Sequence, residues 1–396
     1  MNVKEVQENL MASPLFNLSL SSKELFHSNF LYWIGQQYPV LFRDIFTNEK
    51  FGCKADWTND EPGSWTVKRE HENFDLCLVT LSGISFVLEN KVKSIPTKSQ
   101  LDRYYEKVGT GSQDLILLSL ATKFPGRSAI EADGKWKICS YKDLSKAIQD
   151  SVRDYKGQLP DYDKGLINDY CQFINNLHEL SESWDVKADH RFLLTKDDKK
   201  VCNDLRIGDL QDKIWYSALF ERLNDCLRKS EKGFKVISGK DINDIRDEGN
   251  CLNEVFTNWG FTHGQGLMDA KVKINSDYVL LIQLQGNRYC RAIEWIANKD
   301  LGYNGFWKKT QEEKLIRELS FFQFDKNDNI SYPAICEKER DSISMRKSKD
   351  KVGNFCKYGN RFLYQAKNIK EDATVSNVID AIVKELECVI EKAKTL

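Results

Sequence analysis

The chain has 396 residues, in which 58 Lys and Arg stand against 59 Asp and Glu, so its formal net charge is −1 at pH 7. This length predicts two domains rather than one, and a hydrophobic fraction of 41% is enough to build their cores. The near-zero charge excludes binding of nucleic acid through a globally basic surface, so any basic region must be local.

The eleven cysteines are scattered singly, without a Cys-x-x-Cys pair. This spacing argues against a zinc site or a redox motif, and an odd number fits reduced thiols better than a disulfide framework. The first ten residues lack the pattern of a secretory leader, and no apolar run approaches the length of a membrane span. We therefore expect a soluble, cytoplasmic protein without a membrane segment.

Two helices are predicted at the start of the chain, over residues 3–11 and 21–37. Ser21 is a candidate N-cap with Glu24 three residues later, which is the spacing of a capping box. His27, one turn further on, is interpreted as a buried, hydrogen-bonded histidine. The apolar residues expected on the buried side of the second helix are Leu25, Phe26, Phe30, Trp33 and Ile34.

After a polar loop, a β-hairpin is predicted within residues 76–88, where two short apolar runs are divided by a Ser-Gly pair suited to a tight turn. Asp75 precedes the first run, and Glu89 follows the second with Lys91 two residues on. Because side chains alternate along a strand, Glu89 and Lys91 point the same way, and antiparallel pairing brings Asp75 alongside them. Two carboxylates and one amine are therefore expected to converge.

This set of side chains is typical of a site for a hard divalent cation. Magnesium prefers oxygen ligands, commonly one or two carboxylates together with waters and a substrate phosphate. We expect Asp75 and Glu89 to hold Mg²⁺ (or Mn²⁺), with the backbone carbonyl of Asn90 as a third ligand. Lys91 is then placed to orient the attacking water or to stabilise a pentacovalent phosphate, which predicts phosphodiester hydrolysis.

A short helix is predicted after residue 97, and it carries Gln100 and Tyr104 on one face because they are four residues apart. A buried amide and a buried hydroxyl both need hydrogen-bond partners. We expect both to reach the cavity of Glu89 and Lys91, where they would hold the lysine or a substrate phosphate. The alternative is that Tyr104 closes the core with its hydroxyl in water while Gln100 lies on the surface.

The remaining elements of the first half alternate strand and helix. Residues 114–120 form a continuous apolar run typical of a central strand buried on both faces. A second strand is predicted over 136–139, followed by helices over 141–154 and 161–179. Together with the hairpin, this order predicts an α/β sandwich around a mixed sheet.

These residues resemble a known family. Asp75, the triplet 89–91 (Glu-Asn-Lys) and residues 100–104 (Gln-x-x-x-Tyr) resemble the PD-(D/E)XK nuclease superfamily, and the Gln-x-x-x-Tyr element is similar to its recombination-exonuclease branch. Phe74 stands where the family has proline. Residues 22–33 are also similar to the first helix of such bacterial proteins. The resemblance covers roughly the first half of the chain.

The resemblance implies a restriction-endonuclease-like mixed sheet flanked by helices. It also implies a metal-dependent nuclease that acts on DNA, in defence against foreign DNA or in repair. In the family an acid on the first helix can reach the metal. Glu24 is accordingly a candidate catalytic residue, although the local cap explains the same residue equally well.

A polar stretch over residues 181–190 marks the boundary between two predicted domains, 1–182 and 190–396. The second is expected to be an α+β domain whose strands join through tight turns into an antiparallel meander. Its predicted elements are a helix over 209–229, strands over 233–238, 251–258, 267–274, 278–285 and 288–295, a helix over 310–319, a strand over 361–366 and a helix over 374–393.

Aromatic and basic residues gather in two segments of the second domain, 303–309 and 338–351. Such residues can stack on bases and follow phosphates. Because acidic residues interleave with the basic ones, we favour loop aromatics packed on the core beside a solvated charged segment. The role of this domain in recognition, partner docking or small-ligand sensing stays open.

A second hairpin repeats one spacing of the first. Asp75 and Glu89 are 14 positions apart, as are Asp269 and Gln283. We interpret the repeat as a chance similarity between two hairpins. With a glutamine in place of the second carboxylate, the later hairpin is not expected to be a metal site.

The leading hypothesis is a Mg²⁺-dependent nuclease that hydrolyses DNA, with RNA as an open alternative substrate and the second domain in specificity or control. One alternative is a non-catalytic nucleic-acid- or protein-binding module on the same fold. Another is an effector nuclease that stays silent until a ligand or partner binds the second domain, through which a homodimer could also form. The joint presence of Asp75, Glu89 and Lys91 favours the enzyme.

Overall fold

The computed structural model of the chain describes residues 3–19, 23–61, 63–109, 111, 113–239, 245, 252–297, 301–313, 334–339, 351–352, 355–359 and 361–395. The chain divides into two compact units. Unit 1 comprises residues 1–185 and 197–214, and unit 2 comprises residues 186–196 and 215–396. Residues 197–214, which the sequence prediction assigns to the second domain, thus lie in unit 1.

Unit 1 is built on a five-stranded sheet with the strand order β1-β2-β3-β4-β5. The first three strands pair antiparallel, and β3, β4 and β5 pair in parallel. The strands span Thr66–His71, Phe74–Thr80, Gly83–Lys91, Asp114–Ser119 and Lys137–Ser140. The predicted α/β fold around a mixed sheet is therefore confirmed.

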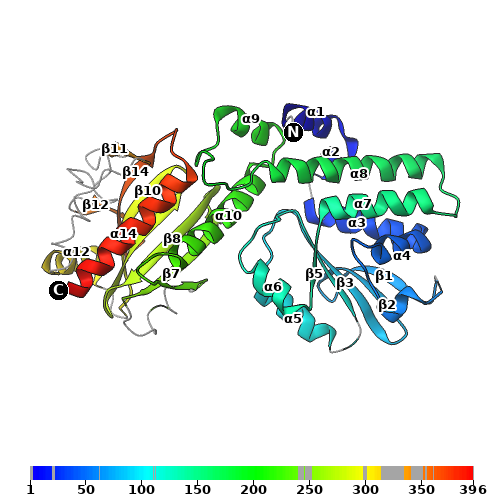
Figure 1. Ribbon diagram of the computed structural model, residues 1–396, viewed down its shortest axis with the longest axis horizontal. Helices are drawn as coiled ribbons and strands as arrows, with labels where there is room; N and C mark the ends of the chain where they lie inside the picture. Colours follow the sequence, from blue (N-terminus) through cyan, green and yellow to red (C-terminus); the bar gives the residue numbers. More distant parts are fainter. Residues whose placement is uncertain are drawn as a thin grey trace. The chain divides into compact units, whose positions relative to one another are not determined.

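Helices flank both faces of this sheet, with α3, α4, α7 and α8 on one side and α5 and α6 on the other (Figure 1). The helices α2, α6 and α9 are not predicted from the sequence. The bounds are Val3–Ala12 for α1, Pro14–Ser19 for α2, Lys23–Gln37 for α3, Pro39–Thr47 for α4, Lys98–Val108 for α5, Arg127–Asp133 for α6, Tyr141–Asp154 for α7, Asp161–Glu182 for α8 and Lys196–Asp204 for α9.

An aromatic cluster joins the sheet to α4. Phe42 and Phe46 of α4 are fully buried, as are Trp57 and Phe86. The ring centroids of Phe46 and Phe86 are 4.8 Å apart, and those of Trp57 and Phe86 are 5.6 Å apart. Burying one such side chain stabilises a fold by roughly 1.5–3 kcal/mol. The cluster therefore holds β3 firmly, and β3 carries two of the predicted catalytic residues.

In its described residues, unit 2 contains a nine-stranded sheet. Eight strands follow the order β12-β13-β14-β10-β9-β8-β7-β6, and β11 also pairs with β14. The predicted antiparallel meander is confirmed as β7 to β10. The strands β6 to β14 span Lys235–Ser238, Glu254–Thr262, Gln265–Lys273, Tyr278–Gln285, Arg288–Trp295, Ile335–Glu339, Lys351–Val352, Phe355–Tyr358 and Phe362–Ile369. The helices span Gly208–Arg228 (α10, of which residues 208–214 belong to unit 1), Gly302–Glu312 (α12) and Val375–Thr395 (α14).

One predicted helix of unit 2 is misplaced. It is expected to begin at residue 310, but α12 begins at Gly302, so the aromatic segment 303–309 is helical and not a loop. Phe306 is 1% exposed and packs on Trp295 with ring centroids 5.4 Å apart. This burial decides the position of the helix, since the segment contains glycines that favour other conformations. The predicted features at Ser21, 314–319 and 340–350 lie outside the described residues.

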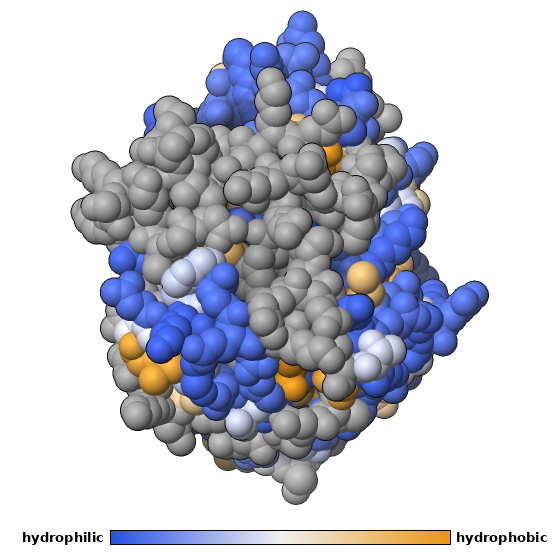
Figure 2. All heavy atoms as spheres, turned by 90° about the vertical axis from the view of Figure 1, so that its left-hand side faces the viewer, coloured by the Kyte–Doolittle hydropathy of each residue, from blue (hydrophilic) through white to orange (hydrophobic). Residues whose placement is uncertain are grey.

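The surface turned to the viewer in Figure 2 is mostly hydrophilic where its atoms are coloured, and its hydrophobic residues form small separate patches. Single exposed apolar side chains are normal on protein surfaces. Within the described ranges, no helix has the length and apolar character needed to cross a membrane.

Candidate active site

β2 and β3 form the predicted hairpin and bring its acidic residues to one end. Leu76 pairs with Leu88, so the next position in the register sets Asp75 opposite Glu89. Opposite residues of an antiparallel pair have neighbouring side chains on one face. The Oδ2 atom of Asp75 also accepts a hydrogen bond from the backbone N–H of Asn90 at 2.7 Å. The carboxylate of Asp75 is therefore tied to the strand end that carries Glu89.

Glu89 lies at the centre of a buried polar cluster. Its Oε1 atom is 2.6 Å from Nζ of Lys91 and accepts a hydrogen bond from Nε2 of Gln100 at 3.3 Å. Nε2 of Gln100 also donates to the hydroxyl of Tyr104 at 3.1 Å. Glu89 is only 2% exposed and Lys91 only 8%. The helix α5 thus turns Gln100 toward the hairpin, and Tyr104 joins the cluster through Gln100.

The other oxygen of Glu89, Oε2, is buried and has no hydrogen-bond partner within the described part of the chain. Leaving a buried polar atom unpaired costs about 1–3 kcal/mol. Magnesium prefers such oxygens, so Oε2 and the carboxylate of Asp75 fit a divalent cation. In the part of the chain that the structure describes, no three His, Cys, Asp or Glu side chains form a metal site by themselves. The ligand set would therefore need the carbonyl of Asn90, waters or a substrate phosphate.

Burial and, after it, the carboxylate of Asp75 raise the pKa of the Glu89 carboxyl to about 7, although Lys91 opposes the shift. Burial also raises the pKa of Asp75, although the N–H of Asn90 opposes this. For Lys91, burial alone would lower the pKa, but the carboxylates of Glu89, Asp75 and Glu24 together outweigh burial and the pKa is raised. Two neighbouring acids with raised pKa values, one buried and one half-buried, are typical of a site that a cation completes.

Glu24, on α3, binds the loop that follows β3. Its Oε1 atom accepts hydrogen bonds from the N–H groups of Lys93 at 3.0 Å and Ser94 at 2.8 Å, and from the Ser94 hydroxyl at 2.7 Å. The charge of Glu24 also raises the pKa values of Asp75 and Glu89. Glu24 therefore lies near both acids and fixes the loop beside them.

Asn90 is fully buried and joins β3 to two helices. Its Nδ2 atom donates to the carbonyl of Glu24 at 2.9 Å and to the hydroxyl of Ser28 at 3.4 Å. Its Oδ1 atom accepts from the hydroxyl of Tyr141 at the start of α7. These bonds fix the strand end that carries the acid and the lysine. Sequence reasoning missed the bonds of Ser28 and Tyr141 to Asn90, because each residue lies more than fifty positions from Asn90.

His27 is a core residue, as predicted. It is 1% exposed, its Nδ1 atom is 3.0 Å from the hydroxyl of Tyr170, and burial lowers its pKa to about 3. It is therefore neutral at physiological pH. Among the apolar residues predicted on the buried side of α3, Phe30 and Ile34 are buried, whereas Leu25, Phe26 and Trp33 are half-buried.

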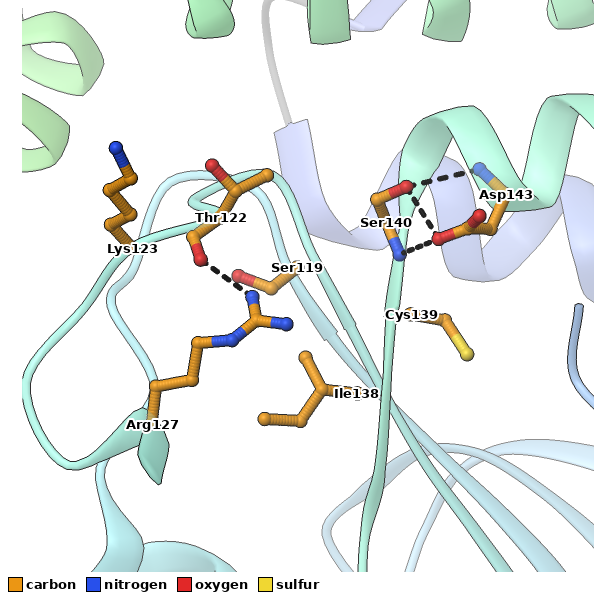
Figure 3. A pocket seen from close by; sticks show the side chains of 8 residues that line it. All are labelled: Ser119, Thr122, Lys123, Arg127, Ile138, Cys139, Ser140 and Asp143. Carbon is orange, nitrogen blue, oxygen red and sulfur yellow. Dashed lines mark hydrogen bonds between the residues drawn. The ribbon is translucent and has the colours of Figure 1, made fainter. Parts of the chain in front are cut away.

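A separate cavity of about 210 Å³ opens at the ends of β4 and β5 (Figure 3). Within it, Nη1 of Arg127 donates to the carbonyl of Thr122 at 2.6 Å. Ser140 and Asp143 bond to each other as the capping box of α7. None of the predicted catalytic residues lines this cavity, and these polar groups are engaged in holding the local fold. We therefore attribute no part of the active site to it.

Comparison of the sequence with known families finds one match, within unit 1. Residues 15–172 match the family model of the PD-(D/E)XK nuclease superfamily. No curated protein and no solved structure matches the chain. The matched range contains the β2–β3 hairpin and α5, while the assignment to the Gln-x-x-x-Tyr branch stays a prediction. The part of the chain from residue 15 to residue 172, less than half of its length, is thus similar to the PD-(D/E)XK nuclease superfamily, and this similarity points to nuclease activity.

Proposed function

We propose that unit 1 hydrolyses phosphodiester bonds of DNA with the help of Mg²⁺ or Mn²⁺. The observation that carries this proposal is the cluster of the half-buried Asp75 with the buried Glu89 and Lys91, in which Oε2 of Glu89 has no hydrogen-bond partner among the described residues. Asp75 and Glu89 would hold the cation, with the backbone carbonyl of Asn90 as a third ligand. When bound, the cation would stabilise the negative charge that develops on the phosphate.

The side chains around Glu89 have separate roles in this proposal. Lys91 keeps its proton at neutral pH because its pKa is raised, so it offers a fixed positive charge to a phosphate in the transition state. Gln100 engages Oε1 of Glu89 and so leaves Oε2 as the oxygen available to a cation. Tyr104 accepts a hydrogen bond from Gln100 and holds its amide in position. Glu24 anchors the adjoining loop.

A non-catalytic binding module would be favoured if one of the three central residues were lost, but Asp75, Glu89 and Lys91 are all present. An effector nuclease that is silent until a ligand or partner binds unit 2 stays the second candidate. A role in defence or repair and membership of the recombination-exonuclease branch are proposed from the family resemblance alone. A cytoplasmic location is proposed from the singly scattered cysteines.

The test is a cleavage assay with the purified full chain. Linear, circular and single-stranded DNA and single-stranded RNA would each be incubated with Mg²⁺, Mn²⁺ or EDTA, and Asp75→Asn would serve as the inactive control. We expect cleavage of DNA with either metal and none in EDTA. Cutting of circular DNA would identify an endonuclease. Cleavage that persists in EDTA would contradict the metal site, and a chain that never cuts DNA would contradict an autonomous nuclease.

A further inference from the structure

Unit 2 contains a cavity of about 1020 Å³ on one face of its sheet. Gln283 of β9 lines it together with Arg288 and Glu294 of β10, and residues at even spacing along a strand share a face. Arg291 of β10 belongs to the opposite face, where it forms a buried ion pair with Glu385 of α14 at 2.8 Å. In Figure 1, α10 and α14 lie along that opposite face. The cavity therefore lies on the face that these two helices do not cover.

The lining of this cavity carries excess positive charge. Three cationic side chains, Lys271, Arg288 and Arg361, face a single carboxylate, that of Glu294. Glu294 is already engaged with Lys271, whose Nζ atom is 3.2 Å from Oε2. Arg288 donates to the neutral amide of Gln285, and Arg361 has no carboxylate partner among the described residues. Among the described residues, these two guanidinium groups are thus left without a counter-charge, which indicates an anionic ligand.

Aromatic side chains stand beside these arginines. Phe362 and Tyr364 of β14 are half-buried, and their ring centroids are 6.0 Å apart. Tyr358, which is 67% exposed, also lines the cavity. Aromatic rings stack on the faces of nucleobases, and glutamine amides can bond to base edges. The cavity therefore combines groups suited to a phosphate with groups suited to a base.

We propose that this cavity of unit 2 binds a nucleotide. Arg288 and Arg361 hold its phosphate, and Phe362 and Tyr364 pack against its base. A volume of about 1020 Å³ is that of a small-molecule site, and two arginines are too few to follow a long polyanionic strand. The inference goes beyond the nuclease proposal and does not rest on it, because the residues belong to unit 2 alone.

The test is calorimetric titration of the full chain without added DNA. The probes are ATP, GTP, CTP and UTP, with AMP, adenosine, inorganic phosphate and a six-nucleotide single-stranded DNA for comparison. We expect saturable binding of at least one nucleotide, and at least tenfold weaker binding of adenosine and of phosphate alone. Arg361→Gln and Arg288→Gln should each weaken that binding at least tenfold. Arg228→Gln, on α10 and half-exposed, is the matched control and should bind as the wild type does.

Several outcomes would overturn the proposal. Saturable binding of none of the nucleotides would do so, as would equal affinity for phosphate and nucleotide, which indicates a simple anion site. Binding of the DNA strand without binding of any nucleotide would assign the cavity to nucleic acid instead. Unchanged affinity in both arginine variants, with unfolding midpoints equal to the wild type, would place the ligand elsewhere.

Discussion

The β2–β3 hairpin of unit 1 and the β8–β9 hairpin of unit 2 share a sequence spacing but distribute charge differently. In unit 1, the register sets Asp75 opposite Glu89, so two carboxylates face each other. In unit 2, Asp269 pairs with Gln283, so one carboxylate faces a neutral amide. Two carboxylates together bind a divalent cation better than one carboxylate does. One residue, Glu89 or Gln283, therefore changes the chemistry that each hairpin can support.

The lysines of the two hairpins also have different surroundings. Lys91 is 2.6 Å from Glu89 on its own strand. Lys271 lies 3.8 Å from Asp269 on its own strand and 3.2 Å from Glu294 on β10. In each unit one lysine thus lies near two acids. In unit 1 both acids belong to the hairpin itself, with Glu24 nearby, whereas in unit 2 one of them belongs to β10. Equal spacing in a sequence does not fix which strands supply the acids of a site.

The largest effect is expected from removing an acid of the first hairpin. Asp75→Asn and Glu89→Gln should each lower kcat/KM for DNA cleavage at least about 1000-fold, because each removes a proposed metal ligand. Asp269→Asn, the matched change in the second hairpin, should cleave as the wild type does. If either unit 1 variant cleaved DNA at the wild-type rate at saturating Mg²⁺, the first hairpin would not be a metal site that the second one lacks.

Lys91→Met should have the next largest effect, a loss of about 10- to 100-fold in kcat, which is typical of a lost charge-stabilising group. The change keeps the length of the side chain and removes its charge. Lys68→Met, on the neighbouring β1, is the control with the same chemistry. If the two variants showed equal activity, Lys91 would serve only to neutralise Glu89 in the folded protein.

A smaller effect is expected on α5. Gln100→Ala and Tyr104→Phe should each reduce kcat by less than about tenfold, because they act on Glu89 through one or two hydrogen bonds. The affinity for Mg²⁺, followed by calorimetry, should stay within about threefold of the wild type. Tyr105→Phe on the same helix is the control. Unchanged kcat in both variants would show that this face of α5 has only a structural role.

The smallest effect concerns stability. The pKa of Glu89 is about 7 in the folded protein and ordinarily 4.5, so between these values the folded state keeps a proton that the unfolded state has released. The free energy of unfolding should therefore fall as pH rises through this window, on the order of 1–3 kcal/mol. Asp269, with a pKa of about 6 against 3.8, should produce a similar fall at lower pH.

The unfolding midpoint would be measured from pH 4 to pH 8 in the wild type, Glu89→Gln and Asp269→Asn. Each variant should flatten its own part of the profile. Added Mg²⁺ should flatten only the part that belongs to Glu89, because a bound cation holds that carboxylate ionised. A wild-type profile that Mg²⁺ leaves unchanged would count against cation binding between Asp75 and Glu89.

The hairpin of unit 1 could be predicted from the sequence because its signals are local. The alternation of apolar residues between 74 and 91, the Ser-Gly turn and the position of Asp75 lie within one short segment. The spacing of Gln100 and Tyr104 likewise requires only one helix. The start of α12 could not be predicted in this way, because the packing of Phe306 on Trp295 outweighs the weak helix propensity of the glycines beside it.

By itself, the sequence determined which residues lie on one strand or one helix, and so the set of Asp75, Glu89, Lys91, Gln100 and Tyr104. Only the tertiary structure decided how that set is held. Asn90 bonds to residues of α3 and α7, and Glu24 bonds to the loop after β3 across about seventy positions of chain. The cavity of unit 2 likewise depends on strands that are far apart in sequence. Periodicity carries no information about such contacts, because it describes one element at a time, and they depend on how separate elements pack.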